Sequence, residues 1–127
     1  MSRKQKFYDA YYNNFNELLD NLGIIRPNDM SLLTFKTCVS MYVNINGKNS
    51  LVNTMNLYVK DYTEKIIKRD ESFFLQELIN EFKDDSFIVS EISKIREIWI
   101  DPSTSIESKD TIWKHFIIFA RLSKIIG

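Results

Sequence analysis

The chain has 127 residues, of which 44% are hydrophobic, 13% aromatic and 27% charged. This length is typical of one domain, and so high a content of aromatic and apolar residues excludes a wholly disordered chain. The 17 basic and 17 acidic residues cancel, so no net charge attracts nucleic acid or an anionic membrane. The single cysteine, Cys38, excludes an internal disulfide, and the single histidine, His115, excludes a zinc site built on two histidines.

No signal peptide or membrane span is recognisable. The segment Met1–Lys6 is polar and basic and lacks the apolar core of a signal peptide. The longest unbroken apolar run, 116–120, is far shorter than the roughly 20 residues that cross a bilayer. We therefore expect an intracellular protein that is not secreted and has no membrane span.

The first predicted helix covers about Arg3–Leu22, where apolar residues recur every three or four positions. Gly23 follows the last of them and is the expected C-terminal cap, and Pro27 prevents the helix from continuing. Either Asn28 or Asp29 then caps the second helix.

The second predicted helix covers about Met30–Asn44 and the third about Ser50–Lys68. The residues between them, 44–49, are rich in Asn and Gly and predict a turn. A fourth helix over about Glu71–Phe82 starts from a cap at Asp70, unless the third and fourth helices form one long rod.

The last two helices are predicted on either side of a loop. The fifth opens at a cap within Asp84–Ser86, and the sixth runs from near Ser108 to about Ile126. Between them, Pro102 and its polar neighbours predict a loop. No alternating strand pattern occurs, so the sequence predicts a compact all-α bundle of five or six helices in a single domain. Its expected core includes five aromatic residues: Phe15, Phe74, Trp99, Trp113 and Phe116.

Few residues favour catalytic chemistry. The three glycines stand far apart, so they form no phosphate-binding loop. Cys38 lies beside Val39 on a predicted helix and is expected to be a small buried residue. His115 falls off the apolar stripe of the last helix and is expected to be partly exposed. With no motif that joins a nucleophile, a histidine and an acid, we expect no enzyme, no cofactor and no metal site.

Two sets of residues are candidate partner surfaces. Residues 70–91 hold seven acidic side chains and one lysine, and this acidic face is either simply solvated or a docking surface for a basic partner. The aromatic-rich start of the first helix covers more than one helix face, so its rings either pack internally or form a self-association surface. The residues concerned are Asp70, Glu77, Glu81 and Asp84 for the acidic face, and Tyr8 and Tyr12 for the aromatic start.

Basic residues gather in three segments, at 3–6, 65–69 and 114–124. If the helices that carry them adjoin, they form a patch for phosphate groups or for an acidic protein. No single helix concentrates enough of them for insertion into a nucleic-acid groove, so a solvated surface is favoured.

The C-terminal half contains a recurring pattern of aromatic and charged residues. Its parts are Val59-x-x-Tyr62, the run Lys-Arg-Asp-Glu-Ser-Phe-Phe-Leu at 68–75, Ile95-x-x-Ile98-Trp99, and Lys109-Asp110-x-Ile112-Trp113. The pattern resembles segments of small uncharacterised all-helical proteins of nucleocytoplasmic large DNA viruses, except that His115 stands where a Tyr is usual. The resemblance implies a virus of a eukaryotic or protist host and no catalytic residue. An excess of Ile, Lys and Asn, whose codons are AT-rich, agrees with such a genome.

Together these features predict a non-enzymatic protein–protein interaction module that is virus-encoded. It would act as a minor virion component or a host-directed adaptor, in the host-cell cytoplasm or the virion, and would bind a protein partner or a second copy. The alternative is a nucleic-acid-associated accessory protein for viral transcription or packaging.

Overall fold

The computed structural model describes residues 3–72 and 86–127. Every element within these residues is a helix, which confirms the predicted all-α fold class. In chain order the elements are α1 (Arg3–Ile25), α2 (Met30–Asn46), α3 (Lys48–Val59), the 3₁₀ turn η1 (Lys60–Tyr62), α4 (Thr63–Ile67), α6 (Ser86–Ile100) and α7 (Ile106–Ile126).

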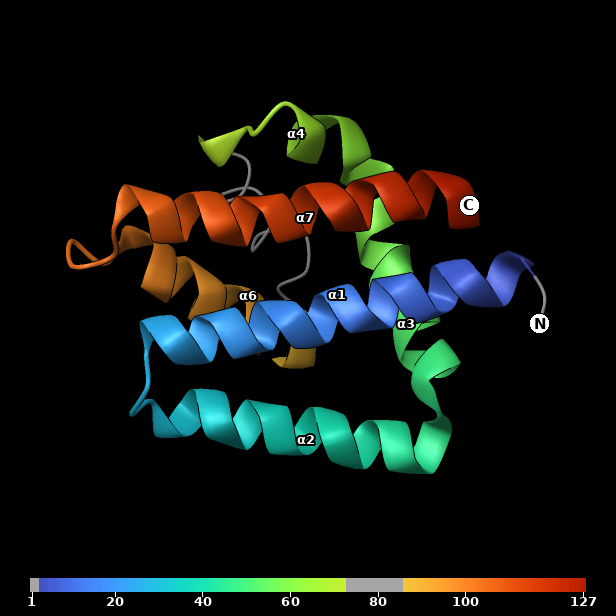
Figure 1. The fold of residues 1–127 in the computed structure, drawn as a ribbon, viewed down its shortest axis with the longest axis horizontal. Helices are drawn as coiled ribbons and strands as arrows, with labels where there is room; N and C mark the ends of the chain where they lie inside the picture. The colour runs from blue at the N-terminus through green and yellow to red at the C-terminus, as the bar shows by residue number, and fades with distance from the viewer. Residues whose placement is uncertain (1–2, 73–85) are drawn as a thin grey trace.

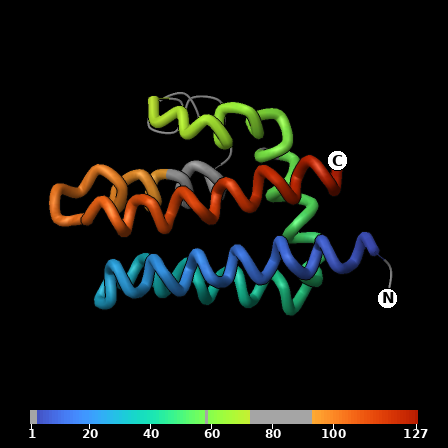
Figure 2. The backbone as a smooth tube through the Cα atoms, turned by 45° about the horizontal axis from the view of Figure 1, so that its top comes forward, coloured from blue at the N-terminus to red at the C-terminus, as the bar shows by residue number. Residues whose placement is uncertain are grey.

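Helices α1 and α7 form the centre of the fold. They lie side by side and antiparallel, with both chain ends at the same end of the molecule (Figure 1). Helix α2 lies along α1 at one edge of the bundle, and α3 crosses from α2 towards α7. Helix α4 covers the side of α7 away from α1, as Figure 2 also shows. The central pair is therefore covered from several directions, whereas the described neighbours of α2 all lie on one side of it.

The core lies where α1 meets α7. The ring of Phe119 packs against Tyr11, with centroids 4.8 Å apart, and against Phe15, with centroids 6.4 Å apart. Helix α6 joins this core through Trp99, whose ring centroid lies 5.5 Å from that of Trp113. The buried hydrophobic residues are Tyr8, Tyr11, Phe15, Leu18, Leu19, Leu22, Leu32, Val39, Leu51, Val52, Ile95, Ile98, Trp99, Ile112, Trp113, Phe119 and Ala120.

Three of the five predicted core aromatics, Phe15, Trp99 and Trp113, are buried. Phe116 is half-buried and packs edge-on against Trp113, and Phe74 lies outside the described residues.

The first helix runs further than its glycine suggested. Gly23 was the expected cap, but α1 continues to Ile25, and the backbone N–H of Arg26 still donates to the carbonyl oxygen of Leu22 at 2.9 Å. The helix ends because Pro27 offers no backbone N–H and disfavours the helical conformation of the residue before it.

The second helix starts at the predicted cap. The Oδ1 atom of Asp29 accepts a hydrogen bond from the backbone N–H of Leu32 at 3.0 Å, and the carboxylate also pairs with Lys94 of α6. The capping bond satisfies a donor that would otherwise lack a partner in the first turn of a helix.

The predicted turn at 44–49 is wrong in extent. Helix α2 continues to Asn46 and α3 begins at Lys48, so Gly47 alone separates them. Its φ of +87° and ψ of 156° lie in a region that only glycine enters readily. Gly47, with its positive φ, therefore makes the connection for which the sequence predicted a turn of six residues.

The chain breaks at Asp70, so the predicted third and fourth helices are not one rod. Arg69 has a φ of +55°. Its backbone N–H donates to the carbonyl oxygen of Ile66, and the backbone N–H of Asp70 donates to the carbonyl oxygen of Lys65. This pair of bonds is a Schellman motif, which ends a helix with one left-handed residue. The motif is unusual in having an arginine at that position.

The loop between α6 and α7 lies at 101–105, as predicted. The last helix starts earlier than expected, since the N-cap is Ser105, whose Oγ accepts from the N–H of Ser108 at 3.1 Å. Phe119 takes a core position that the prediction omitted, and Ile125 near the end of the helix is exposed.

Candidate functional site

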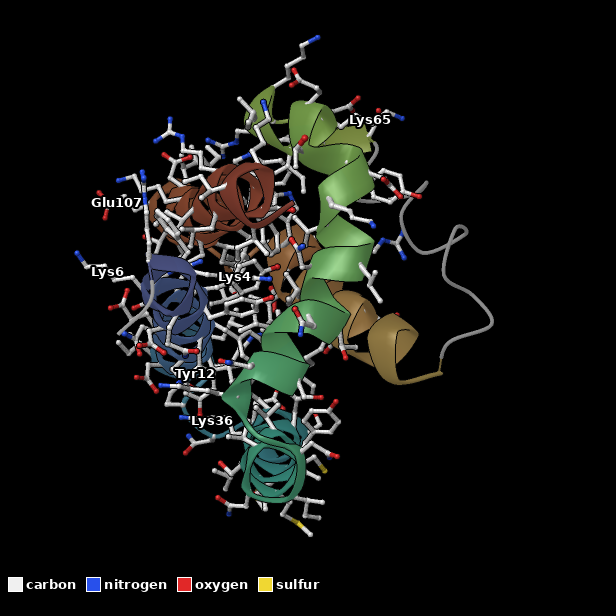
Figure 3. The ribbon with its side chains drawn as sticks, turned by 90° about the vertical axis from the view of Figure 1, so that its right-hand side faces the viewer. Lys4, Lys6, Tyr12, Lys36, Lys65 and Glu107 are labelled. Atoms are coloured by element: carbon white, nitrogen blue, oxygen red, sulfur yellow. The ribbon has the colours of Figure 1, made fainter. Side chains whose placement is uncertain are left out.

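The aromatic start of α1 packs internally, which is the first of the two alternatives that the sequence left open. Tyr8 is buried, and its hydroxyl donates to Oδ1 of Asn53 on α3 at 2.6 Å. Tyr12, labelled in Figure 3, is half-buried against the core. Because α1 has neighbours on several sides, more than one of its apolar faces is covered.

Of the four residues of the predicted acidic face, the structure describes only Asp70. Asp70 is half-buried and accepts a hydrogen bond from the hydroxyl of Ser72 at 2.9 Å. Glu77, Glu81 and Asp84 lie outside the described residues. A basic partner for this face stays a prediction.

His115 is buried, which corrects the expectation that it is partly exposed. Its Nδ1 lies 2.8 Å from Oδ1 of Asn14 and its Nε2 lies 2.8 Å from Nδ2 of Asn21, both on α1. Burial lowers the pKa of the imidazole below its ordinary 6.5, and the charge of Glu17 opposes this shift. Both ring nitrogens bond within the fold, so the side chain joins α1 to α7 in this arrangement. The burial of His115 was not predicted from the sequence, because the side-chain amides that bond its ring, those of Asn14 and Asn21, lie on a helix far away in the chain.

Two residues of the basic segments pair with carboxylates at the surface of the bundle. Arg69 lies 2.6 Å from Asp110 and stacks over the Trp99 and Trp113 rings, and Lys124 lies 2.8 Å from Glu64. Their charge is partly compensated where they lie, which weakens their attraction for phosphate groups.

A small polar pocket lies between the start of α1 and the start of α3. Its volume is about 240 Å³, and it is lined by Lys4, Gln5, Tyr8, Asn49 and Asn53. The amides of Gln5 and Asn49 bond to each other, at 3.0 and 2.9 Å. Its hydrogen-bonding groups are therefore largely engaged with one another, and nothing in the pocket points to a ligand.

The most unusual surface lies on α2. Its inner side packs on the core through Leu32 and Val39, which are buried, and through three half-buried residues, Phe35, Tyr42 and Val43. Its opposite side carries four large apolar side chains with much of their surface in solvent: Met30 (71% exposed), Leu33 (56%), Met41 (57%) and Ile45 (78%). A surface helix usually carries one apolar stripe, which faces the core, so large apolar side chains on the opposite side of α2 are unusual.

Cys38 lies on the same outward side and is exposed, so the expectation of a buried thiol is wrong. Thr34 and Thr37 are exposed beside it. We call the set of Met30, Leu33, Thr34, Thr37, Cys38, Met41 and Ile45 the α2 outer face. In Figure 3 sulfur atoms lie on the outer side of α2, away from the rest of the bundle.

The α2 outer face carries no charge. Lys36 is the one charged residue of the helix, and its side chain lies towards α1, where Nζ is 3.2 Å from Oδ1 of Asp20 (Figure 3). The sequence contains a signal for this second apolar side, because residues 30–45 include more apolar side chains than one face of a helix can hold. Sequence alone did not show which of the two apolar sides would be covered.

Among the described residues no group of three or more His, Cys, Asp or Glu side chains could hold a metal ion. The helices of 3–72 and 86–127 include none with the length and apolar character of a membrane span. No known protein family, curated protein sequence or solved structure matches the chain.

Proposed function

We propose that this chain is a non-enzymatic protein–protein interaction module and that the α2 outer face is its contact surface. The observation that carries the proposal is the exposure of four large apolar side chains along one uncharged helix face. Exposed apolar surface rimmed by polar residues often marks a contact site, and the centres of protein interfaces are depleted of charge and enriched in Met. Met30 and Met41 both lie on this face.

Nucleic-acid binding ranks below this function. Arg69 and Lys124 already contact carboxylates of the bundle, and the 17 basic residues are balanced by 17 acidic ones. Retention of the purified chain on DNA or RNA, falling steeply with salt concentration, would reverse this ranking.

A viral origin forms part of the proposal and rests on the sequence alone. Its support is the excess of Ile, Lys and Asn and the aromatic pattern of the C-terminal half. Within that setting the module would serve as a minor virion component or as an adaptor directed at the host.

The test compares two matched variants in affinity capture from the cells that make the protein. Met41→Glu places a charge on the α2 outer face, and Ile125→Glu places one on α7 at a side chain of nearly equal exposure, 57% against 55%. We expect Met41→Glu to lose the proteins that the unchanged chain captures reproducibly and Ile125→Glu to keep them, as quantified by mass spectrometry. Capture of the same proteins by all three chains would overturn the proposal.

A further inference from the structure

The junction between α2 and α3 carries the only Asn-Gly pair of the chain. Of all the asparagines in the sequence, Asn46 alone precedes a glycine. Asn46 is the last residue of α2, and Gly47 is the single residue between α2 and α3. Both residues are exposed. Water and hydroxide therefore reach two groups that can react with each other, the side-chain amide of Asn46 and the backbone nitrogen of Gly47.

The backbone nitrogen of Gly47 has little around it. A glycine has no Cβ, so no side chain of its own shields its nitrogen from a neighbouring carbonyl carbon. Apart from the residues on either side of Gly47, no heavy atom in the described part of the chain lies within 4 Å of the position that a Cβ would take. The junction therefore has room for a five-membered ring made by Asn46 and Gly47.

The folded backbone keeps the two reacting groups apart. The backbone N–H of Gly47 donates to the carbonyl oxygen of Val43 at 2.8 Å, which closes the last turn of α2. The side-chain Nδ2 of Asn46 donates to the carbonyl oxygen of Tyr42 at 3.3 Å, so the amide group is directed back along the helix. The two groups can meet only when this last turn opens. Helix ends open locally at a far smaller cost in free energy than global unfolding.

We propose that Asn46 is a spontaneous modification site that is gated by opening of the end of α2. The backbone nitrogen of Gly47 loses its proton to hydroxide and attacks Cγ of Asn46. A bond forms between these two atoms, the Cγ–Nδ2 bond breaks, and the Nδ2 group leaves as ammonia with a proton from water. Water then adds to one of the two carbonyl carbons of the resulting succinimide and reopens the ring, which gives aspartate or isoaspartate at position 46.

The modification changes both the charge and the backbone of the junction. A carboxylate replaces a neutral amide, so the formal net charge of the chain goes from 0 to −1. The new charge lies at the carbonyl end of α2, where the helix dipole makes a negative charge unfavourable. The isoaspartate product also places one additional main-chain carbon before Gly47. We therefore expect the hydrogen bond from Gly47 to Val43 to be lost in that product.

Peptide mapping of the aged protein tests the proposal. The folded chain is incubated at pH 8 and 37 °C for several weeks and digested with trypsin, which cleaves after lysine and releases residues 37–48 as one peptide. Tandem mass spectrometry then locates the replacement of NH₂ by OH at Asn44 or Asn46. Asn44 is the matched control, because it is also exposed on α2 but precedes the branched side chain of Ile45. A sample digested at time zero gives the background.

We expect Asn46 to be converted at least about ten times as fast as Asn44, while an acidic form accumulates in parallel on isoelectric focusing. In guanidinium chloride, where α2 is unfolded, the rate at Asn46 should rise by about tenfold or more, because no turn has to open first. The variant Asn46→Gln keeps an amide but would have to close a six-membered ring, so the acidic form should not accumulate in it. Circular dichroism verifies that this variant folds.

Three results would overturn the proposal. The first is conversion of Asn46 no faster than that of Asn44. The second is an equal rate at Asn46 in the folded and the unfolded chain, which would show that the end of α2 gates nothing. The third is an acidic form that accumulates equally in Asn46→Gln, which would place the modification at another residue.

Discussion

Asn14 of α1 and His115 of α7 hold each other by two hydrogen bonds. The Nδ1–H of His115 donates to Oδ1 of Asn14 at 2.8 Å, and Nδ2 of Asn14 donates to the backbone carbonyl oxygen of His115 at 2.9 Å. Asn21 completes the arrangement by donating to Nε2 of the ring. Because Asn14 and His115 are buried, these bonds fix the register of the two central helices.

Replacing Asn14 by Ala leaves the imidazole N–H and the backbone carbonyl without these partners. A buried polar group left unsatisfied costs about 1–3 kcal/mol, so we expect the free energy of unfolding to fall by about 2–4 kcal/mol. Urea denaturation followed by circular dichroism measures this change. Asn13→Ala, at the exposed neighbouring position of α1, is the control and should change the midpoint little. An unchanged midpoint for Asn14→Ala would show that the pair contributes nothing to stability.

The buried imidazole makes stability depend on pH. Burial lowers the folded-state pKa of His115 below 6.5, whereas in the unfolded chain the ring titrates near 6.5. Between the two pKa values the unfolded state binds more protons, so stability rises with pH there. The contribution of His115 is fully present above pH 6.5 and is lost as the pH falls below it.

The urea midpoint should therefore decrease from pH 7.5 to pH 5.5. His115→Gln removes the only histidine, and its midpoint should change less over the same range. The carboxyl pKa of Asp29 is held well below 3.8 by Lys94, so its titration falls outside this window. An equally steep pH dependence in His115→Gln would assign the effect to other groups.

Trp113→Ala should be among the most destabilising single substitutions. The ring is buried, its centroid lies 5.7 Å from that of Phe116, and its Nε1–H donates to the carbonyl oxygen of Ile66 on α4 at 3.1 Å. Loss of a buried ring of this size costs about 3–5 kcal/mol, which lowers the Tm by roughly 10–20 °C in a domain of this length. Thermal melting measures it, with Trp113→Phe expected to lose less. An unchanged Tm would mean that Trp113 is not part of the core.

Two glycines should respond to alanine with opposite signs. Gly23 lies within α1 and has space for a Cβ atom, so Gly23→Ala should raise the free energy of unfolding by about 0.5–1 kcal/mol. Gly47 also has space, but its φ is +87°, so Gly47→Ala should lower it by about 1–3 kcal/mol through backbone strain. Urea midpoints of both variants give the comparison. Changes of the same sign would contradict the assigned roles.

Local signals in the sequence predicted the helices and several of their boundaries. The spacing of apolar residues placed Phe15, Trp99 and Trp113 on inward faces, where they are buried. A cap at Asn28 or Asp29 and a possible break at Asp70 were recognisable, because both depend on bonds within a few residues of the chain. The structure selects Asp29 as the cap and a break at Asp70.

Burial of individual polar and small residues was not predictable in the same way. His115 was expected to be partly exposed and is buried, and Cys38 was expected to be buried and is exposed. For Tyr8 the sequence left internal packing and a contact surface both open, and the residue is buried. Each outcome depends on what the neighbouring helices supply. Asn14 and Asn53 provide hydrogen-bond acceptors that let His115 and Tyr8 enter the interior, and nothing in the described structure covers the side of α2 that carries Cys38.

The sequence by itself determined an all-α protein with an aromatic core, because a helix turns one apolar side inward whichever neighbour it meets. Only the tertiary structure decided which sides are covered. It put α1 at the centre, where a polar pair 101 residues apart in the chain is buried, and α2 at the edge, where a second apolar side faces solvent. The physical reason is that periodicity reflects local preference, whereas burial requires surface contributed by distant residues.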